Sequence, residues 1–132
     1  MTPVPFRSVD PAALVWETRP HADGEPARHV AELSEVLATT HVRANIWRYE
    51  PGATGRRHVH AEQEEMFVVL SGTLTMYLGE PPERVDVPTG GVVRVAGGTP
   101  LQAANHGTEN LVVYVSGYPP DDGAALLDTA IA

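Results

Sequence analysis

The chain has 132 residues, 42% of them hydrophobic and 20% charged, which is typical of one globular domain and excludes a disordered chain. Its 9 basic residues, all arginine, and 17 acidic residues give a net charge of −8, which disfavours nucleic acids and anionic membranes as partners. The absence of cysteine excludes disulfides and thiolate metal ligands. The sequence shows no signal-peptide pattern and no apolar run of the roughly 18 residues that span a bilayer, so we expect a cytoplasmic protein.

Residues 1–40 are rich in Pro, Asp and His and show little periodicity, so we expect an N-terminal arm. One edge strand is predicted near residues 13–16 of this arm. Farther along it, Val30, Leu33 and Leu37 have helical spacing, which predicts one or two helical turns.

Short strand-like segments follow one another through residues 41–117, which we interpret as the core of the domain. They cover 41–49, 64–70, 73–78, 84–87, 92–95, 101–105 and 111–115, and turn-forming pairs such as Ser71-Gly72 separate them. Closely spaced strands without long helices predict an all-β fold, an antiparallel sandwich or barrel, and exclude a parallel α/β fold. In the tail, residues 118–132, a short C-terminal helix is predicted at 124–131.

Two histidines and a glutamate form the strongest candidate site. His58 and His60 are two residues apart, so both rings point to one side of an extended chain. Glu65 follows after a bend-length step, and a returning strand can bring its carboxylate beside the two rings. Two neutral imidazoles and one carboxylate suit a divalent Fe, Mn, Ni, Co, Cu or Zn ion. The alternative is an acidic, solvent-exposed turn without a metal.

Polar or aromatic side chains alternate with apolar ones along 41–49, and the odd positions hold His41, Arg43, Asn45, Trp47 and Tyr49. These odd positions share one face of a strand, which either lines a cavity for an anionic or aromatic ligand or faces solvent or a dimer contact. In the next strand, Phe67 shares the face of Glu65, and we expect it to form a cavity wall. The opposite face carries Met66, Val68 and Leu70, which we expect to be buried against a second sheet or another subunit.

These residues resemble the motifs of the cupin superfamily. The first motif, G-x5-H-x-H-x(3,4)-E-x6-G, is matched at every position by Gly52, His58, His60, Glu65 and Gly72. The second motif, G-x5-P-x-G-x2-H-x3-N, is matched by Gly90, Gly98 and Asn105 but carries Ala96 for the proline and Leu101 for the histidine. The resemblance implies an antiparallel jelly-roll barrel over 41–117 with His58, His60 and Glu65 as metal ligands.

The missing histidine at Leu101 is the family's fourth metal ligand, and three interpretations remain open. The site holds a metal on three ligands with more room for substrate, or it has a substitute ligand among Gln102, His106 and His41, or it binds no metal. The resemblance and the alternating face together give the candidate ligand-binding residues His41, Arg43, Asn45, Trp47, Phe67, Leu101 and Gln102.

The resemblance also implies a small-molecule function. The leading hypothesis is a metal-dependent oxygenase, isomerase or cyclase that acts on a carbonyl-bearing metabolite. One alternative is a non-catalytic ligand-binding cupin with a degenerate metal site. Another is a metal-free, epimerase-like cupin in which His58 or His60 is the base and a tyrosine (Tyr49, Tyr77 or Tyr114) is the acid. A homodimer is expected, since many cupins form one.

Overall fold

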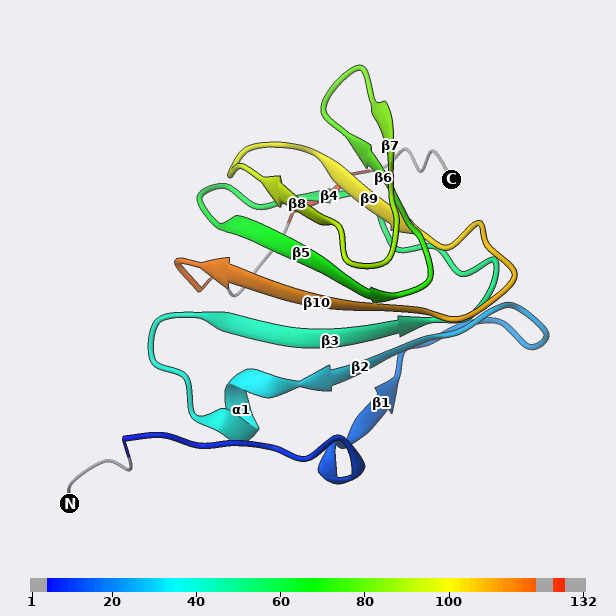
Figure 1. Cartoon of the computed structure of the whole chain (residues 1–132). Coiled ribbons are helices and arrows are strands. Elements are labelled where there is room, and N and C mark those ends of the chain that lie inside the picture. The colour runs from blue at the N-terminus through cyan, green and yellow to red at the C-terminus, as the bar shows by residue number, and fades with distance from the viewer. Residues whose placement is uncertain (1–4, 121–124, 128–132) are drawn as a thin grey trace.

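The computed structural model describes residues 5–120 and 125–127, and it consists of two antiparallel sheets (Figure 1). The larger sheet has, in spatial order, β1 (Trp16–Thr18), β2 (Arg28–Glu32), β3 (Arg43–Tyr49), β10 (Leu111–Tyr118), β5 (Glu64–Ser71) and β8 (Val92–Val95). The smaller sheet has β11 (Ala125–Leu126), β4 (His58–Val59), β9 (Leu101–Ala104), β6 (Leu74–Leu78) and β7 (Glu83–Val87). The predicted all-β, antiparallel fold is confirmed, although the strands form two sheets rather than one closed barrel in the described part of the chain.

The hydrophobic core lies between the two sheets. Leu111 and Val113 of β10 and Val69 of β5 contribute from the larger sheet, and Leu74 and Met76 of β6 contribute from the smaller one. All five are at most 2% exposed. The core therefore holds together the two sheets that carry the candidate site.

The N-terminal segment differs from the expected arm. The strand expected near 13–16 begins later, at Trp16, because Pro11–Ala13 form a 3-10 turn (η1) capped by the Asp10 side chain. Val30, expected in a helical turn, lies instead in β2, where it pairs with Trp47 of β3 and is 1% exposed. Only the later part of that pattern is helical, as α1 (Leu33–Leu37). The pairing of β1 and β2 with β3 makes this segment part of the larger sheet.

The C-terminal helix expected at 124–131 is wrong where the structure describes this segment. Ala125–Leu126 form β11, which pairs with β4, and the Leu127 N–H donates a hydrogen bond to the Arg57 carbonyl. The backbone groups here are thus used between strands rather than along a helix. Residues 124 and 128–131 lie outside the described residues. No helix in the described ranges is long and apolar enough to cross a membrane.

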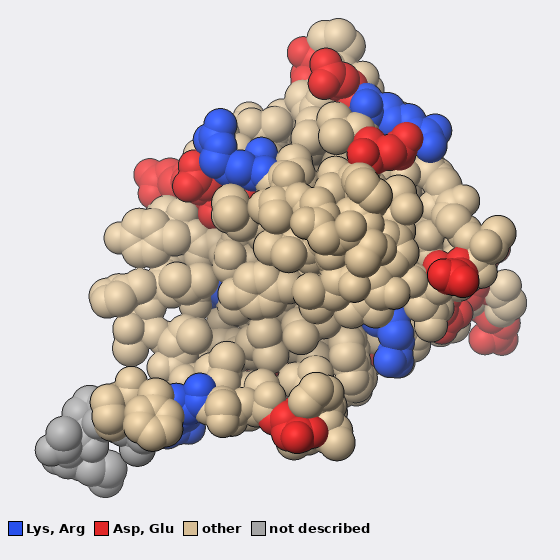
Figure 2. Space-filling model, in the orientation of Figure 1, with Lys and Arg blue, Asp and Glu red and all other residues tan. Residues whose placement is uncertain are grey.

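The outer face of the larger sheet carries an apolar row that the smaller sheet does not cover. The strand register aligns one residue from each of the six strands, and this outer apolar row consists of Trp16, Ala31, Ile46, Tyr114, Val68 and Val92. Val92 is 53% exposed, and two residues of the neighbouring strand β5, Met66 (41%) and Leu70 (49%), are exposed as well. In Figure 2 the middle of the visible face carries no charged side chain, and charged side chains lie around its rim. The second sheet therefore does not bury this face of β5.

Two motif residues outside the histidine–glutamate group shape turns. Gly72 has φ +83°, and a Cβ there would lie 2.8 Å from the Asn110 carbonyl oxygen, so a side chain has no room. The buried Asn105 side chain donates hydrogen bonds to the carbonyl oxygens of Tyr49 (2.9 Å) and Glu109 (2.8 Å), and it accepts one from the Gly107 N–H. Asn105 thereby joins the ends of β3 and β9 to the loop before β10.

Candidate metal centre

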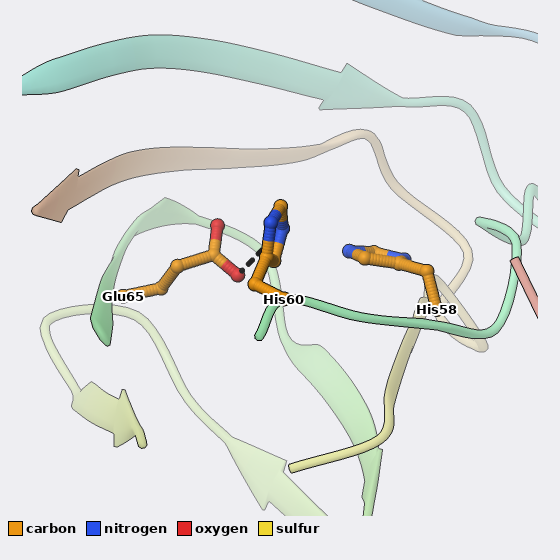
Figure 3. Close-up of side chains that lie close together, drawn as sticks. All are labelled: His58, His60 and Glu65. Atoms are coloured by element: carbon orange, nitrogen blue, oxygen red, sulfur yellow. Dashed lines mark ion pairs between the residues drawn. The ribbon is translucent and has the colours of Figure 1, made fainter. Parts of the chain in front are cut away.

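The structure brings His58, His60 and Glu65 together from both sheets (Figure 3). His58 lies in β4 of the smaller sheet, His60 follows that strand directly, and Glu65 lies near the start of β5 in the larger sheet. His60 is 7% exposed and Glu65 is 9% exposed, whereas His58 is half-buried. The bend between β4 and β5 therefore places the carboxylate beside the two rings, as the spacing predicts.

The ligand atoms of these three side chains lie within one coordination sphere. One ligating atom from each residue can be chosen so that all three are within 4.8 Å of one another. His60 Nε2 is 3.4 Å from Glu65 Oε1, and the two imidazole rings are 5.1 Å apart between centroids at an angle of 89°. Two nitrogen donors and one oxygen donor at this spacing fit a divalent transition metal.

The backbone orients His58 for this role. Its Nδ1 lies 2.8 Å from the Arg56 carbonyl oxygen, and since a carbonyl only accepts hydrogen bonds, Nδ1 carries the proton. The lone pair is then on Nε2, the other nitrogen of the ring. A backbone carbonyl that holds the second nitrogen of a histidine is a common partner of metal-binding imidazoles.

Leu101 closes the position where a fourth ligand is expected. It is the Cα partner of His58 across β4 and β9 and is 3% exposed. An isobutyl side chain therefore stands beside the His58 ring, and it offers no donor atom. The three proposed substitutes do not join the group. His41 is exposed in the bend before β3, His106 hydrogen-bonds the Tyr77 hydroxyl at 3.0 Å, and Gln102 donates to the Gly55 carbonyl at 2.9 Å.

A cavity of about 320 Å³ surrounds the histidine–glutamate group. Of the candidate ligand-binding residues, the cavity walls contain Arg43, Asn45, Trp47, Phe67 and Leu101, but neither His41 nor Gln102. The register explains this selection, because Asn45 of β3, Val115 of β10 and Phe67 of β5 are successive partners in one row. The polar face of β3 from Arg43 to Tyr49 thus points into the cavity.

Several cavity residues are not among the candidate ligand-binding residues of the sequence. The polar ones among them are Arg28, Arg56 and Gln63, together with Tyr49, which the sequence placed on the alternating face and among the candidate acids. The Gln63 amide donates to the Pro119 carbonyl at 3.1 Å and lies against Gly117, where a Cβ would be only 2.5 Å from Gln63 Cδ. Gln63 fits in the cavity wall because Gly117 of β10 has no side chain. Since Gly117 is distant in sequence, the residues around Gln63 do not reveal this position.

Tyr49 has a perturbed phenol. Burial raises the pKa of Tyr49, an effect that the neighbouring Arg28 charge and its hydrogen bond oppose and that the charge of Glu65 reinforces. Its hydroxyl faces Gly55, where a Cβ would lie 2.9 Å away. The phenol is thus a protonated hydrogen-bond donor in the same cavity as the histidine–glutamate group.

Comparison with known proteins gives a family match and a set of similar folds. A family model described as "Cupin domain" matches residues 45–117. A conserved protein with a double-stranded beta-helix domain from Klebsiella pneumoniae is 25% identical, with 84% of this chain and 90% of that chain covered and a TM-score of 0.67. A sugar phosphate isomerase from a cupin superfamily of Silicibacter pomeroyi is 21% identical, with 86% and 76% covered and a TM-score of 0.73.

An oxalate oxidase in complex with the substrate analogue glycolate is also similar in fold. It is 21% identical, with 76% of this chain and 55% of that chain covered and a TM-score of 0.66. A search of the curated proteins finds no match. The likeness to these enzymes, at such identities, concerns the fold.

Proposed function

The chain belongs to the cupin domain family, and on that premise we propose that it is a metal-dependent enzyme acting on a small carbonyl-bearing metabolite by oxygenation, isomerisation or cyclisation. The observation that carries this proposal is the group of His58, His60 and Glu65, whose ligand atoms lie within 4.8 Å of one another inside a cavity. When bound there, a divalent metal supplies Lewis-acid polarisation of a substrate oxygen.

The chain's own residues add positioning and exclusion of water. Phe67, Leu101 and Val113 form an apolar wall, so a substrate that lies against this wall excludes water from that side of the cavity. The Asn45 amide and the Tyr49 hydroxyl offer hydrogen bonds from β3 to substrate oxygens. Because burial raises the pKa of Tyr49, its hydroxyl keeps the proton near neutral pH and can donate it to a developing oxyanion.

Elemental analysis by mass spectrometry tests the metal site directly. Protein purified without a chelator or a histidine tag is compared with a His58→Ala/His60→Ala variant, each after incubation with Fe, Mn, Ni, Co, Cu and Zn ions and desalting. The matched control is His41→Ala/His106→Ala, which removes two histidines outside the cavity. We expect near-stoichiometric metal in the parent and the control and a trace in the site variant. Trace metal in all three proteins would refute the proposal.

A metal-free, epimerase-like function has one observation in its favour. Of the three candidate acids, Tyr49 lines the cavity, whereas Tyr77 hydrogen-bonds His106 and Tyr114 belongs to the outer apolar row. This function requires turnover that is lost on Tyr49→Phe in protein that contains no metal. A non-catalytic binding protein would bind ligand in the cavity without any turnover.

We also propose that two copies of the chain associate through the outer apolar row. This row crosses all six strands of the larger sheet, and Val92, Met66 and Leu70 expose apolar surface on the same face. Exposed apolar side chains that lie close together on one face, as Val92, Met66 and Leu70 do, commonly mark an interface. A symmetric pair would bury the row against itself. The cytoplasmic location stays a prediction.

A further inference from the structure

The cavity gathers positive charge in a chain that is strongly negative overall. Three arginines, Arg28, Arg43 and Arg56, line it, and Glu65 is the one carboxylate among the described residues of its walls, whereas the whole chain has a net charge of −8. A divalent cation on the histidine–glutamate group would increase this local positive charge further. A concave site with this charge attracts small anions.

Arg28 is the best-positioned of the three. Its guanidinium carbon lies 5.5 Å from the centroid of the Trp47 ring and 5.9 Å from that of Tyr49. These contacts with β3 restrict the side chain to the cavity side of the sheet. The backbone of Gly55, three residues before His58, lies next to this pair, since a Cβ there would be 2.9 Å from Tyr49 Oη and 3.8 Å from Arg28 Nη1.

Arg28 differs in its partners from about half of the other arginines of the chain. Four others form ion pairs with carboxylates, namely Arg19 with Glu17, Arg57 with Glu80, Arg84 with Asp86 and Arg94 with Glu64. Among the described residues, no carboxylate oxygen lies within 4.0 Å of the Arg28 guanidinium. Aromatic rings and a phenol hold this cation in place, and they leave donor positions of its planar fork for a ligand.

We infer that the cavity's ligand is a small molecule with an oxyanion, a carboxylate or a phosphate, that Arg28 binds, and with an apolar body that lies against Phe67, Leu101 and Val113. The inference rests on the proposed function, since it assumes that substrate enters this cavity. Guanidinium groups bind the two oxygens of such anions in a paired geometry. The cavity volume of about 320 Å³ limits the ligand to the size of a small metabolite.

Trp47 provides a reporter of binding that does not depend on activity. The chain has two tryptophans, and Trp16→Phe leaves Trp47, in contact with Arg28 in the cavity wall, as the single tryptophan, whose emission can be excited selectively. In this background, benzoate, phenyl phosphate and the uncharged benzamide are titrated at fixed ionic strength while Trp47 emission is followed. The variants are Arg28→Gln, which removes the charge, and Arg28→Lys, which keeps it, with Arg84→Gln of β7 as the matched control.

We expect benzoate or phenyl phosphate to bind saturably, and the tighter of the two identifies the class of oxyanion. Arg28→Gln should weaken that binding by about tenfold or more, Arg28→Lys by less, and Arg84→Gln not at all, whereas benzamide should bind weakly and equally to all. Three outcomes would each overturn the inference. They are equal affinity for benzoate, phenyl phosphate and benzamide, no saturable binding of any probe, and unchanged affinity in a folded Arg28→Gln variant. Metal content, measured separately on the same preparations, tests the proposed function. Failure of the metal site and failure of oxyanion binding by Arg28 can therefore be told apart.

Discussion

Replacing Leu101 with histidine would place a fourth donor beside the metal centre. Residue 101 is the cross-strand partner of His58 and lines the cavity, so an imidazole there is beside the three proposed ligands. The substitution has two opposing effects, which are separable by adding metal. Without metal it exchanges a buried apolar side chain for a polar one, and with metal it adds a ligand.

The cost without metal follows from the 3% exposure of Leu101. Loss of leucine burial costs about 2 kcal/mol, and an imidazole buried without a partner costs about 1–3 kcal/mol more. For a domain of this size we expect a drop in Tm of about 10–20 °C. With metal, a fourth ligand should raise the affinity at least about tenfold, or about 1.4 kcal/mol, so the added metal should raise the Tm of Leu101→His more than that of the parent.

The assay combines thermal melts, with and without metal, and competition for the ion against a chelator. Leu101→Phe is the control, because it introduces a ring of similar shape that has no donor atom. If Leu101→His folds but binds metal no more tightly than the parent, or if its metal-induced rise in Tm equals that of Leu101→Phe, then residue 101 does not face the bound ion and the assignment of the three ligands is wrong.

Three further outcomes are expected. A hydrogen bond of 2.8 Å from His29 lowers the pKa of Glu50 from its ordinary value of 4.5. A lowered carboxyl pKa stabilises the fold at pH values above 4.5, and this contribution is lost as the pH falls through the lowered pKa. Glu50→Gln should therefore destabilise the protein in urea titrations at pH 7 but hardly once the pH lies below the lowered pKa of Glu50, and an equal loss under both conditions would contradict this. Val68→Glu, in the middle of the outer apolar row, should halve the mass measured by light scattering, and a parent that is already monomeric would exclude the dimer. Leu111→Ala, at a position 0% exposed, should lower the free energy of unfolding by about 2–5 kcal/mol, and Val15→Ala, at 83% exposure, by much less, with similar losses contradicting the assigned core.

Local patterns in the sequence predicted most strands of the central region, although β4 (His58–Val59) was not among them and β3 begins at Arg43 rather than at residue 41. Alternation along 41–49 predicts which residues of β3 share a face, and the spacing of His58, His60 and Glu65 predicts that they converge. Both depend on the two-residue period of a strand, which is a property of contiguous residues.

Features that depend on long-range pairing were not predictable in the same way. Val30 fits a helical spacing, and only its pairing with Trp47 of β3 makes it a strand residue. The segment at 125–126 has a helix-like composition, but β4 supplies backbone partners for it as a strand. Arg28 enters the cavity only because β2 joins the sheet beside β3, so no motif around residue 28 could identify it.

Because β2 pairs with β3, the residues proposed to bind the metal and the arginine proposed to bind the ligand come from different parts of the chain. The candidate metal ligands His58, His60 and Glu65 lie within the family-matched residues 45–117, whereas Arg28 comes from a hairpin that precedes them. Changes in this hairpin can alter what the cavity selects while the metal ligands stay constant, so relatives with the same histidines and glutamate need not share a substrate. A chain trimmed to the matched segment would begin inside β3, lose its neighbour β2 and expose an unpaired edge that favours aggregation.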